Sequence, residues 1–250
     1  MSDDEQYVDG DADLVAGDPM PSARVPLSRD RIVATALAFI DEQGLPGLTM
    51  RRLGERLGVE AMSLYRYVPG REDLLDAVVE ATVAEMQADD EVVNTPADGW
   101  QDYVIRLAHG VRRVALRHPK AFPLVASRPA EAPWLRPPLR SLDWVESFLD
   151  ALVGEGFDDE AAVGAYRAFT SFLLGHLLLE VATRGADVGP LDVLEPEQEP
   201  GADALAEYPT VRRLAGDLSQ DHSATEFEEA LEDLVNRLAL IFNEHQRGHH

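Results

Sequence analysis

The chain has 250 residues, 45% of them hydrophobic, which suits one large or two modest domains with a sizeable buried core. It contains no cysteine, which excludes disulfide frameworks, thiolate metal sites and cysteine nucleophiles. The formal net charge of −24 would argue against a nucleic-acid partner if the charge were spread evenly along the chain.

The charge is not spread evenly. Residues 1–23 carry seven acids and no base, residues 24–71 carry eight arginines against five acids, and the remainder carries 14 bases against 34 acids. A basic segment on an acidic body would present one end of the protein to phosphate groups. The acidic segment 1–23 is poor in large apolar residues, so we expect a disordered arm, and the first domain is predicted over residues 24–88.

The N-terminal residues are acidic where a signal peptide needs positive charge. The most apolar run, residues 172–182, is too short to span a bilayer. We therefore expect a cytoplasmic protein with no membrane partner.

A first helix is predicted between Ser28, whose hydroxyl can cap free backbone N–H groups, and Gly44. A short second helix follows Thr49, another capping residue, and ends at Gly58. A third short helix follows and stops at residues 69–70, a Pro-Gly pair. Two short helices with so tight a turn between them must cross steeply, as in a helix-turn-helix motif.

The remaining apolar residues recur at helical spacing, and we find no convincing alternation of period two. The chain is therefore predicted to be all-α, with a second, helical domain over residues 89–250. Further helices are predicted over residues 71–86, 98–118, 134–153, 158–184, 210–218 and 225–245.

Motifs for phosphate-binding loops, zinc proteases, serine hydrolases and dinucleotide binding are not found in the sequence. No paired acid and base stands in apolar surroundings. We therefore expect no catalytic residue, no metal, no cofactor and no enzymatic activity.

Residues 48–75, LTMRRLGERLGVEAMSLYRYVPGREDLL, resemble the DNA-binding segment of the TetR (tetracycline-repressor) family. The later segments GFDDEAAVGAYRAFTSFLLGHLLLE and EFEEALEDLVNRLALIF resemble its effector-binding and dimerisation half. The resemblance spans about residues 26–245. It implies an N-terminal three-helix helix-turn-helix domain and a C-terminal helical ligand-binding and dimerisation domain.

The resemblance also implies which residues meet a double-stranded DNA operator. Those that resemble phosphate contacts are Thr49, Tyr65, Tyr67 and Arg71, and Arg51 can reach phosphate or base. Base-facing positions are occupied by Ala61, Met62, Ser63 and Arg66. Core packing is the alternative for Met62, Leu64 and Val68, and we favour it for Leu64 and Val68.

A homodimer is implied, with an interface built from residues 158–184 and 225–245 of both chains. The alternative is that both apolar stripes are buried within one chain.

An unknown small-molecule effector is implied in the helical body. The candidate pocket residues are Trp100, Tyr103, Arg106, His109, Phe122, Arg128, Trp144, Phe148, Phe169, Phe172 and His176.

Arg128–Pro129 matches a motif of the tetracycline repressors, but Leu124 stands where those proteins place a metal-anchoring histidine. This departure favours an effector other than a magnesium–drug chelate. Three functions remain open: a ligand-responsive repressor; a DNA-binding activator or a regulator controlled by a protein partner; and an enzyme or adaptor that reuses the helical body.

Overall fold

The structure, a computed structural model, describes residues 26–89, 92, 96, 98–128, 141–188 and 207–248, with side chains to residue 244. These residues form ten α-helices and one 3-10 helix, with no strand among them, which confirms the all-α prediction. The predicted disordered arm, residues 1–23, lies outside the described residues, as do the first residues of the helix predicted from residue 134.

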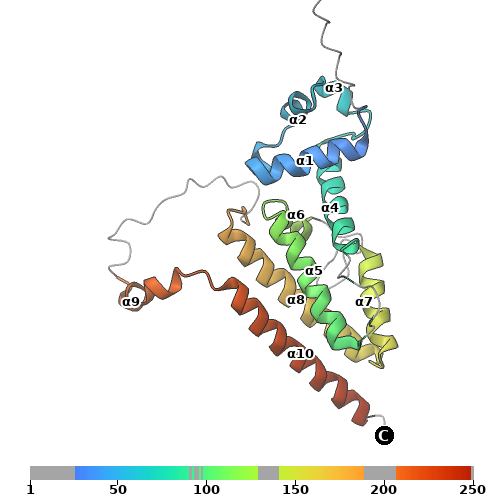
Figure 1. The fold of residues 1–250 in the computed structure, drawn as a ribbon, viewed down its shortest axis with the longest axis vertical. Helices are drawn as coiled ribbons and strands as arrows, with labels where there is room; N and C mark the ends of the chain where they lie inside the picture. Colours follow the sequence, from blue (N-terminus) through green and yellow to red (C-terminus); the bar gives the residue numbers. More distant parts are fainter. Residues whose placement is uncertain are drawn as a thin grey trace, which may run out of the picture.

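The N-terminal helices form a small unit that we call the head, residues 26–79 (Figure 1). It contains α1 (Arg29–Gln43), η1 (Leu45–Gly47), α2 (Met50–Leu57), α3 (Ala61–Leu64) and the first half of α4 (Arg71–Gln87). The two predicted caps are confirmed: the Ser28 hydroxyl accepts from the Arg31 N–H, and the Thr49 hydroxyl accepts from the Arg52 N–H, both at 3.2 Å. Local chemistry therefore sets where α1 and α2 begin.

The body is a helical bundle with its own apolar core. It contains α5 (Trp100–Arg117), α6 (Phe122–Ser127), α7 (Leu142–Gly154), α8 (Asp159–Thr183) and α10 (Ser223–Gly248), while α9 (Pro209–Leu218) has no buried residue. The helix α8 packs against α5, α6, α7 and α10. By length and composition α8 alone among the described helices could cross a membrane, but a core helix of a bundle has the same composition.

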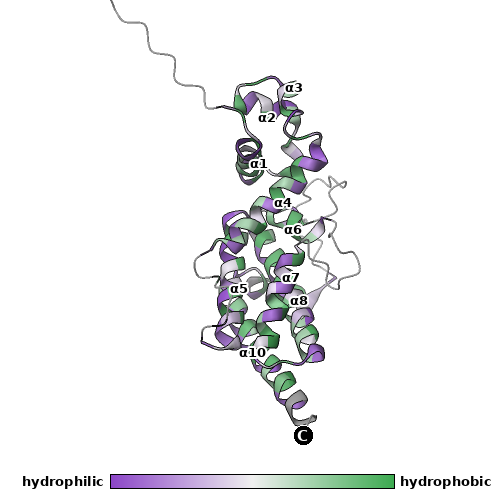
Figure 2. Ribbon diagram, turned by 90° about the vertical axis from the view of Figure 1, so that its right-hand side faces the viewer, coloured by the Kyte–Doolittle hydropathy of each residue, from purple (hydrophilic) through white to green (hydrophobic). Residues whose placement is uncertain are grey.

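Head and body are joined by α4 and α6 (Figure 2). The helix α4 begins in the head and packs against both α5 and α6. Two residues at the start of α6 and just before it, Leu124 and Ala121, are buried in the apolar core of the head, whereas Phe122 is buried in the core of the body. The short helix α6 therefore contributes to both cores.

The turn between α2 and α3 is tight because two glycines permit it. Gly58 ends α2 with φ of 70°, a left-handed conformation that glycine adopts without a steric penalty. A Cβ atom on Gly54 would lie 2.8 Å from the Val59 carbonyl oxygen and 3.2 Å from the Ala61 nitrogen. The close approach of α3 to α2 thus depends on the missing side chain at residue 54.

We expect the Gly54→Ala substitution to destabilise the head by about 1–3 kcal/mol, because the added methyl group overlaps backbone atoms that cannot move independently. Thermal unfolding followed by circular dichroism measures the loss. The control is Gly216→Ala in α9. A Cβ atom there would have no other atom within 4 Å, so this substitution should not lower the stability of the protein. Equal melting curves for the two variants would show that α2 and α3 pack less closely than described.

Candidate nucleic-acid interface and cavity

The helix α3 is held in place by one face and exposes the other. Leu64 and Val68 are buried at 0% and 1% exposure, which confirms the packing role favoured for them. Met62, by contrast, is 76% exposed. An apolar side chain held in solvent next to an anchored residue is available for contact with a partner.

All nine residues predicted to meet DNA lie between the N-cap of α2 and the first residue of α4, at the end of the molecule remote from α10 (Figure 1). None of them is buried. The exposed residues are Thr49, Arg51, Met62, Tyr65, Arg66, Tyr67 and Arg71, and the half-buried ones are Ala61 and Ser63.

The arginines of this surface differ in what already holds them. The guanidinium of Arg51 forms an ion pair with Glu55 at 3.3 Å, but the Arg51 side chain remains 84% exposed. Arg71 donates from Nε to the Leu48 carbonyl oxygen at 3.4 Å, which orients its side chain at the start of α4. Within the described part of the chain, Arg66 has neither a hydrogen bond nor an ion pair, so its guanidinium is free to bind an acceptor.

Two further arginines of α2, Arg52 and Arg56, fasten the helix to α1. The Arg52 guanidinium donates to the Gly47 carbonyl oxygen at 2.9 Å and lies 4.9 Å from the centre of the Phe39 ring. Arg56 forms a two-pronged contact with Glu42, and its hydrogen bonds lower the pKa of the Glu42 carboxyl group. These contacts were not predicted, because sequence spacing does not show which face of α2 meets α1.

The body contains an apolar cavity bounded by five helices. Its envelope, including the open mouth, is about 540 Å³, of which about 50 Å³ can hold the centre of a water molecule. Polar side chains are few, and the lining residues are Val83, Met86, Val111, Phe122, Val125, Ser141, Trp144, Phe169, Thr170, Leu173 and Leu174. As described, this space would hold a few waters and would have to widen for a larger molecule.

Three of the eleven candidate pocket residues line this cavity: Phe122, Trp144 and Phe169. Three others surround the Phe227 ring of α10, with ring centres 5.2–5.7 Å away: His109, Phe172 and His176. Val83 and Met86 of α4 also line the cavity but were not among the candidates, because apolar spacing along a helix does not show which of its residues border a cavity.

The remaining candidates have other partners. Trp100 packs edge-on against Phe157 with ring centres 5.2 Å apart, and Arg106 forms an ion pair with Asp102. Tyr103 and Phe148 pack together in the core, where burial raises the pKa of Tyr103 to about 12. Among the described residues, no group of three or more His, Asp or Glu side chains could hold a metal ion.

The eleventh candidate, Arg128, lies at the end of α6 and reaches across to α4. It donates from Nη1 to Glu72 at 2.8 Å and from Nε to Asp76 at 2.8 Å, and its side chain is only 11% exposed. Both acceptors follow Arg71 within two turns of α4. The end of α6 is therefore tied to the part of α4 that adjoins the candidate nucleic-acid interface.

Comparison with known proteins agrees with this two-part organisation. Residues 32–78 match the model of bacterial regulatory proteins of the tetR family, and residues 94–239 match the tetracyclin repressor-like C-terminal domain. The chain belongs to the TetR family. Both halves of the resemblance seen in the sequence are thereby confirmed.

Curated relatives of this TetR-family chain include an HTH-type transcriptional regulator of Saccharopolyspora erythraea, 32% identical over 64% of this chain and 64% of the relative. The transcriptional repressor DrrR1 of Streptomyces coeruleorubidus is 32% identical over 63% and 55% of the two chains. The class D tetracycline repressor protein of Escherichia coli is 31% identical over 61% and 66%. The matches thus span less than two thirds of each relative's length.

Solved structures share the fold. A possible TetR-family transcriptional regulator of Streptomyces coelicolor has a TM-score of 0.65 and 30% identity, and the match covers 86% of this chain and 100% of that one. ActR of Streptomyces coelicolor in complex with actinorhodin has a TM-score of 0.61 and 27% identity, with 86% and 96% covered.

The Arg128→Ala substitution should loosen the first turns of α4, because it removes the guanidinium that joins the Glu72 and Asp76 carboxylates to the end of α6. We expect amide hydrogen exchange of residues 74–78 to rise about tenfold, the effect of losing one charged hydrogen bond. Hydrogen-exchange mass spectrometry measures it. Arg106→Ala is the control, since its ion pair with Asp102 lies within α5. Equal exchange in α4 for both variants would contradict the link.

Proposed function

We propose that this chain is a ligand-responsive transcriptional repressor that binds a palindromic operator as a homodimer and leaves it when a small-molecule effector binds. The proposal rests on the way two regions of the protein, the head and the body, are connected by two helices. An exposed, arginine-bearing surface lies on the head, an apolar cavity lies in the body, and α4 and α6 contribute to both regions.

The shape and charge of the head support DNA as the partner. The segment 24–71 carries eight arginines against five acids, whereas the rest of the chain is acidic. The second helix of a helix-turn-helix motif enters the major groove with its first turn near base edges, while the first helix crosses the backbone. In that arrangement Met62, Ser63 and Arg66 reach bases, and Thr49, Tyr67 and Arg71 reach phosphates.

Two solvent-facing leucines support the homodimer. Leu179 on α8 is 72% exposed and Leu240 on α10 is 64% exposed, although both helices also pack against each other within the chain. Exposed apolar residues on neighbouring helices are typical of a surface that a second copy covers. A twofold dimer would present two heads to half-sites one or more helical turns apart.

The lining of the cavity supports an apolar effector. Its walls carry three aromatic rings, and Ser141 and Thr170 are its polar side chains. The structure of ActR holds actinorhodin, and several curated relatives are named as tetracycline repressors. An aromatic effector with few charges fits this chemistry. Leu124, at the position where the tetracycline repressors have a metal-anchoring histidine, has no side-chain atom that can bind a metal.

The path from cavity to head is short. Phe122 and Val125 of α6 line the cavity, and Arg128 at the end of the same helix binds Glu72 and Asp76 on α4. A ligand that moves α6 therefore moves the start of α4. The size of the change in operator affinity is set by how much more tightly the ligand binds one head orientation than the other.

We expect Arg66→Ala to relax sequence preference at one base pair in each half-site, because a bidentate arginine–guanine contact contributes about 1–3 kcal/mol of discrimination. Arg71→Ala should weaken binding to all sequences alike and reduce the dependence on salt, because it removes a phosphate contact. Fluorescence anisotropy with a duplex selected from a random library, and with its single-base-pair variants, measures both effects.

Equal loss on every duplex for Arg66→Ala would contradict the assignment of that residue. If the unaltered protein showed neither a preference among duplexes nor a steep loss of affinity with rising salt, DNA recognition itself would be refuted. Arg52→Ala serves as a further comparison. The Arg52 side chain contacts α1, so this substitution should affect DNA binding by lowering the stability of the head.

We expect Leu179→Glu to convert the dimer to monomers, because it places a carboxylate in an apolar interface at a cost of about 3 kcal/mol or more. The dissociation constant should rise at least about a hundredfold. Sedimentation velocity at micromolar concentration measures it. Leu142→Glu on α7, where the leucine is 44% exposed, is the matched control and should leave the dimer intact. A monomer before any substitution would rule out the dimer.

A further inference from the structure

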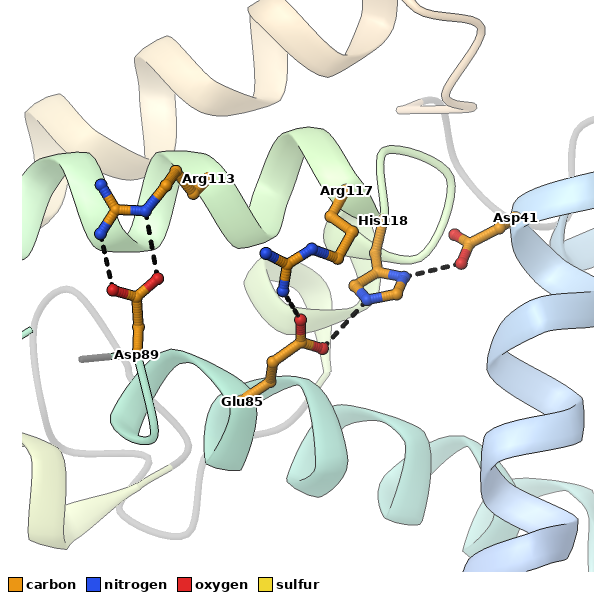
Figure 3. Close-up of polar contacts among 6 residues, drawn as sticks. All are labelled: Asp41, Glu85, Asp89, Arg113, Arg117 and His118. Carbon is orange, nitrogen blue, oxygen red and sulfur yellow. Dashed lines mark hydrogen bonds and ion pairs between the residues drawn. The ribbon is translucent and has the colours of Figure 1, made fainter. Parts of the chain in front are cut away.

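Outside the cavity and the nucleic-acid interface, a histidine lies between two carboxylates where the head meets the body, a junction that we call the seam (Figure 3). His118 follows the last residue of α5, and its side chain is 14% exposed. Its Nδ1 lies 2.7 Å from Asp41 Oδ2 on α1, and its Nε2 lies 3.0 Å from Glu85 Oε2 on α4. The ring therefore connects the first helix of the head with the far half of α4.

The chemistry of this contact requires a charged ring. Ionised carboxylates only accept hydrogen bonds, so each ring nitrogen of His118 must donate one. A neutral imidazole carries a single N–H and would turn a lone pair toward one of the two carboxylates. Only the imidazolium ion satisfies Asp41 and Glu85 together.

Asp41 and Glu85 favour the same state, whereas the positive groups nearby, Arg117, Arg113 and Lys120, oppose it. One oxygen of Asp41, Oδ1, is buried without a hydrogen-bond partner, so that carboxylate depends on His118 for its compensation. Glu85 is shared with Arg117, and just beyond the end of α4 Asp89 binds Arg113 at 2.6 Å (Figure 3). On the other side Lys120 donates to the Glu42 carbonyl oxygen, and α6 carries no ionisable residue.

The backbone of His118 connects this histidine to α6, which lines the cavity. Its carbonyl oxygen accepts hydrogen bonds from Ala121 and Phe122, the residues at which α6 begins. The ring thus fastens the start of α6 to the head, as Arg128 fastens its end to α4.

We propose that His118 is a protonation-dependent latch, which holds the head in the described orientation when its ring is charged and releases it when the ring is neutral. Loss of the imidazolium removes one of two hydrogen bonds and the attraction to both carboxylates. The ratio of latched to released heads should fall about tenfold, the usual effect of one hydrogen bond to a charged group.

The pH window follows from the direction of the pKa shift. Hydrogen bonding to Asp41, with the negative charges of Asp41 and Glu85, raises the pKa of His118 above its ordinary value of about 6.5, against the opposing effect of burial. A raised pKa means that the latch is complete below about pH 6.5 and is lost as pH rises through the folded-state pKa of His118. The transition therefore lies on the alkaline side of the ordinary histidine value.

The test measures the distance between head and body. Because the chain has no cysteine, Ala34→Cys on α1 and Glu146→Cys on α7, both exposed, give a specific donor–acceptor dye pair. Doubly labelled chains are mixed with an excess of unlabelled chains, so that energy transfer reports distances within one chain. We expect the transfer efficiency to change as pH rises above about 6.5, with a midpoint equal to the His118 pKa measured by NMR.

His118→Gln should abolish this titration, while His222→Gln, an exposed histidine before α10, should leave it unchanged. Asp41→Asn removes one of the two carboxylates and should lower the midpoint toward the ordinary histidine pKa. This variant keeps the test valid if His118→Gln does not fold. A transfer efficiency independent of pH in the unaltered chain, or a titration that persists in His118→Gln, would refute the latch.

The consequence for DNA depends on the proposed function, whereas the latch does not. Energy transfer is measured without DNA, so a chain that titrates but binds no operator would keep the latch and refute the repressor. If both hold, operator affinity should change across the same pH window in the unaltered chain and not in His118→Gln.

Discussion

The arrangement of this protein depends on one seam, where α6 lies between the core of the head and the core of the body. Leu124 belongs to the first core and Phe122 to the second, so neighbouring residues of a short helix are buried in two different units. Charged contacts flank this apolar junction, with His118 at its start and Arg128 at its end. Movement of α6 relative to the head must break the charged contacts, and movement relative to the body must break the packing of Phe122. The seam is therefore the natural point of coupling.

The head resolves the apparent conflict between a net charge of −24 and a nucleic-acid partner. Its arginines are divided between two tasks. Arg52 and Arg56 hold α2 against α1 and η1 through Phe39, Glu42 and Gly47, which fixes the angle of the motif. Arg51 and Arg66 remain exposed on the outer surface. A count of basic residues therefore overstates the charge available to phosphate, and the acidic body disfavours any other orientation on DNA.

Local signals predicted the fold well. Ser28, Thr49 and Gly58 act on backbone groups within a few residues, so their roles as helix boundaries could be predicted without tertiary information. The lining of the cavity was harder to predict, because it depends on which face each helix turns toward the interior. Phe169 and Leu173 share the face of α8 that lines the cavity, whereas Phe172 and His176, three residues further along the helix, face Phe227 instead. The aromatic residues were identified, but single-sequence periodicity could not assign them to one space.

The dimensions of the cavity connect these observations. A space that holds a few waters must widen before it can take a molecule with several rings, and the dense core around α5 and α8 resists such a change. The other walls come from α4, α6 and Trp144 of α7. Two of these three, α4 and α6, are fastened to the head or belong to it. Widening the cavity on that side therefore acts on the same seam as the protonation of His118, so an apolar ligand and a proton would bias one equilibrium through different contacts.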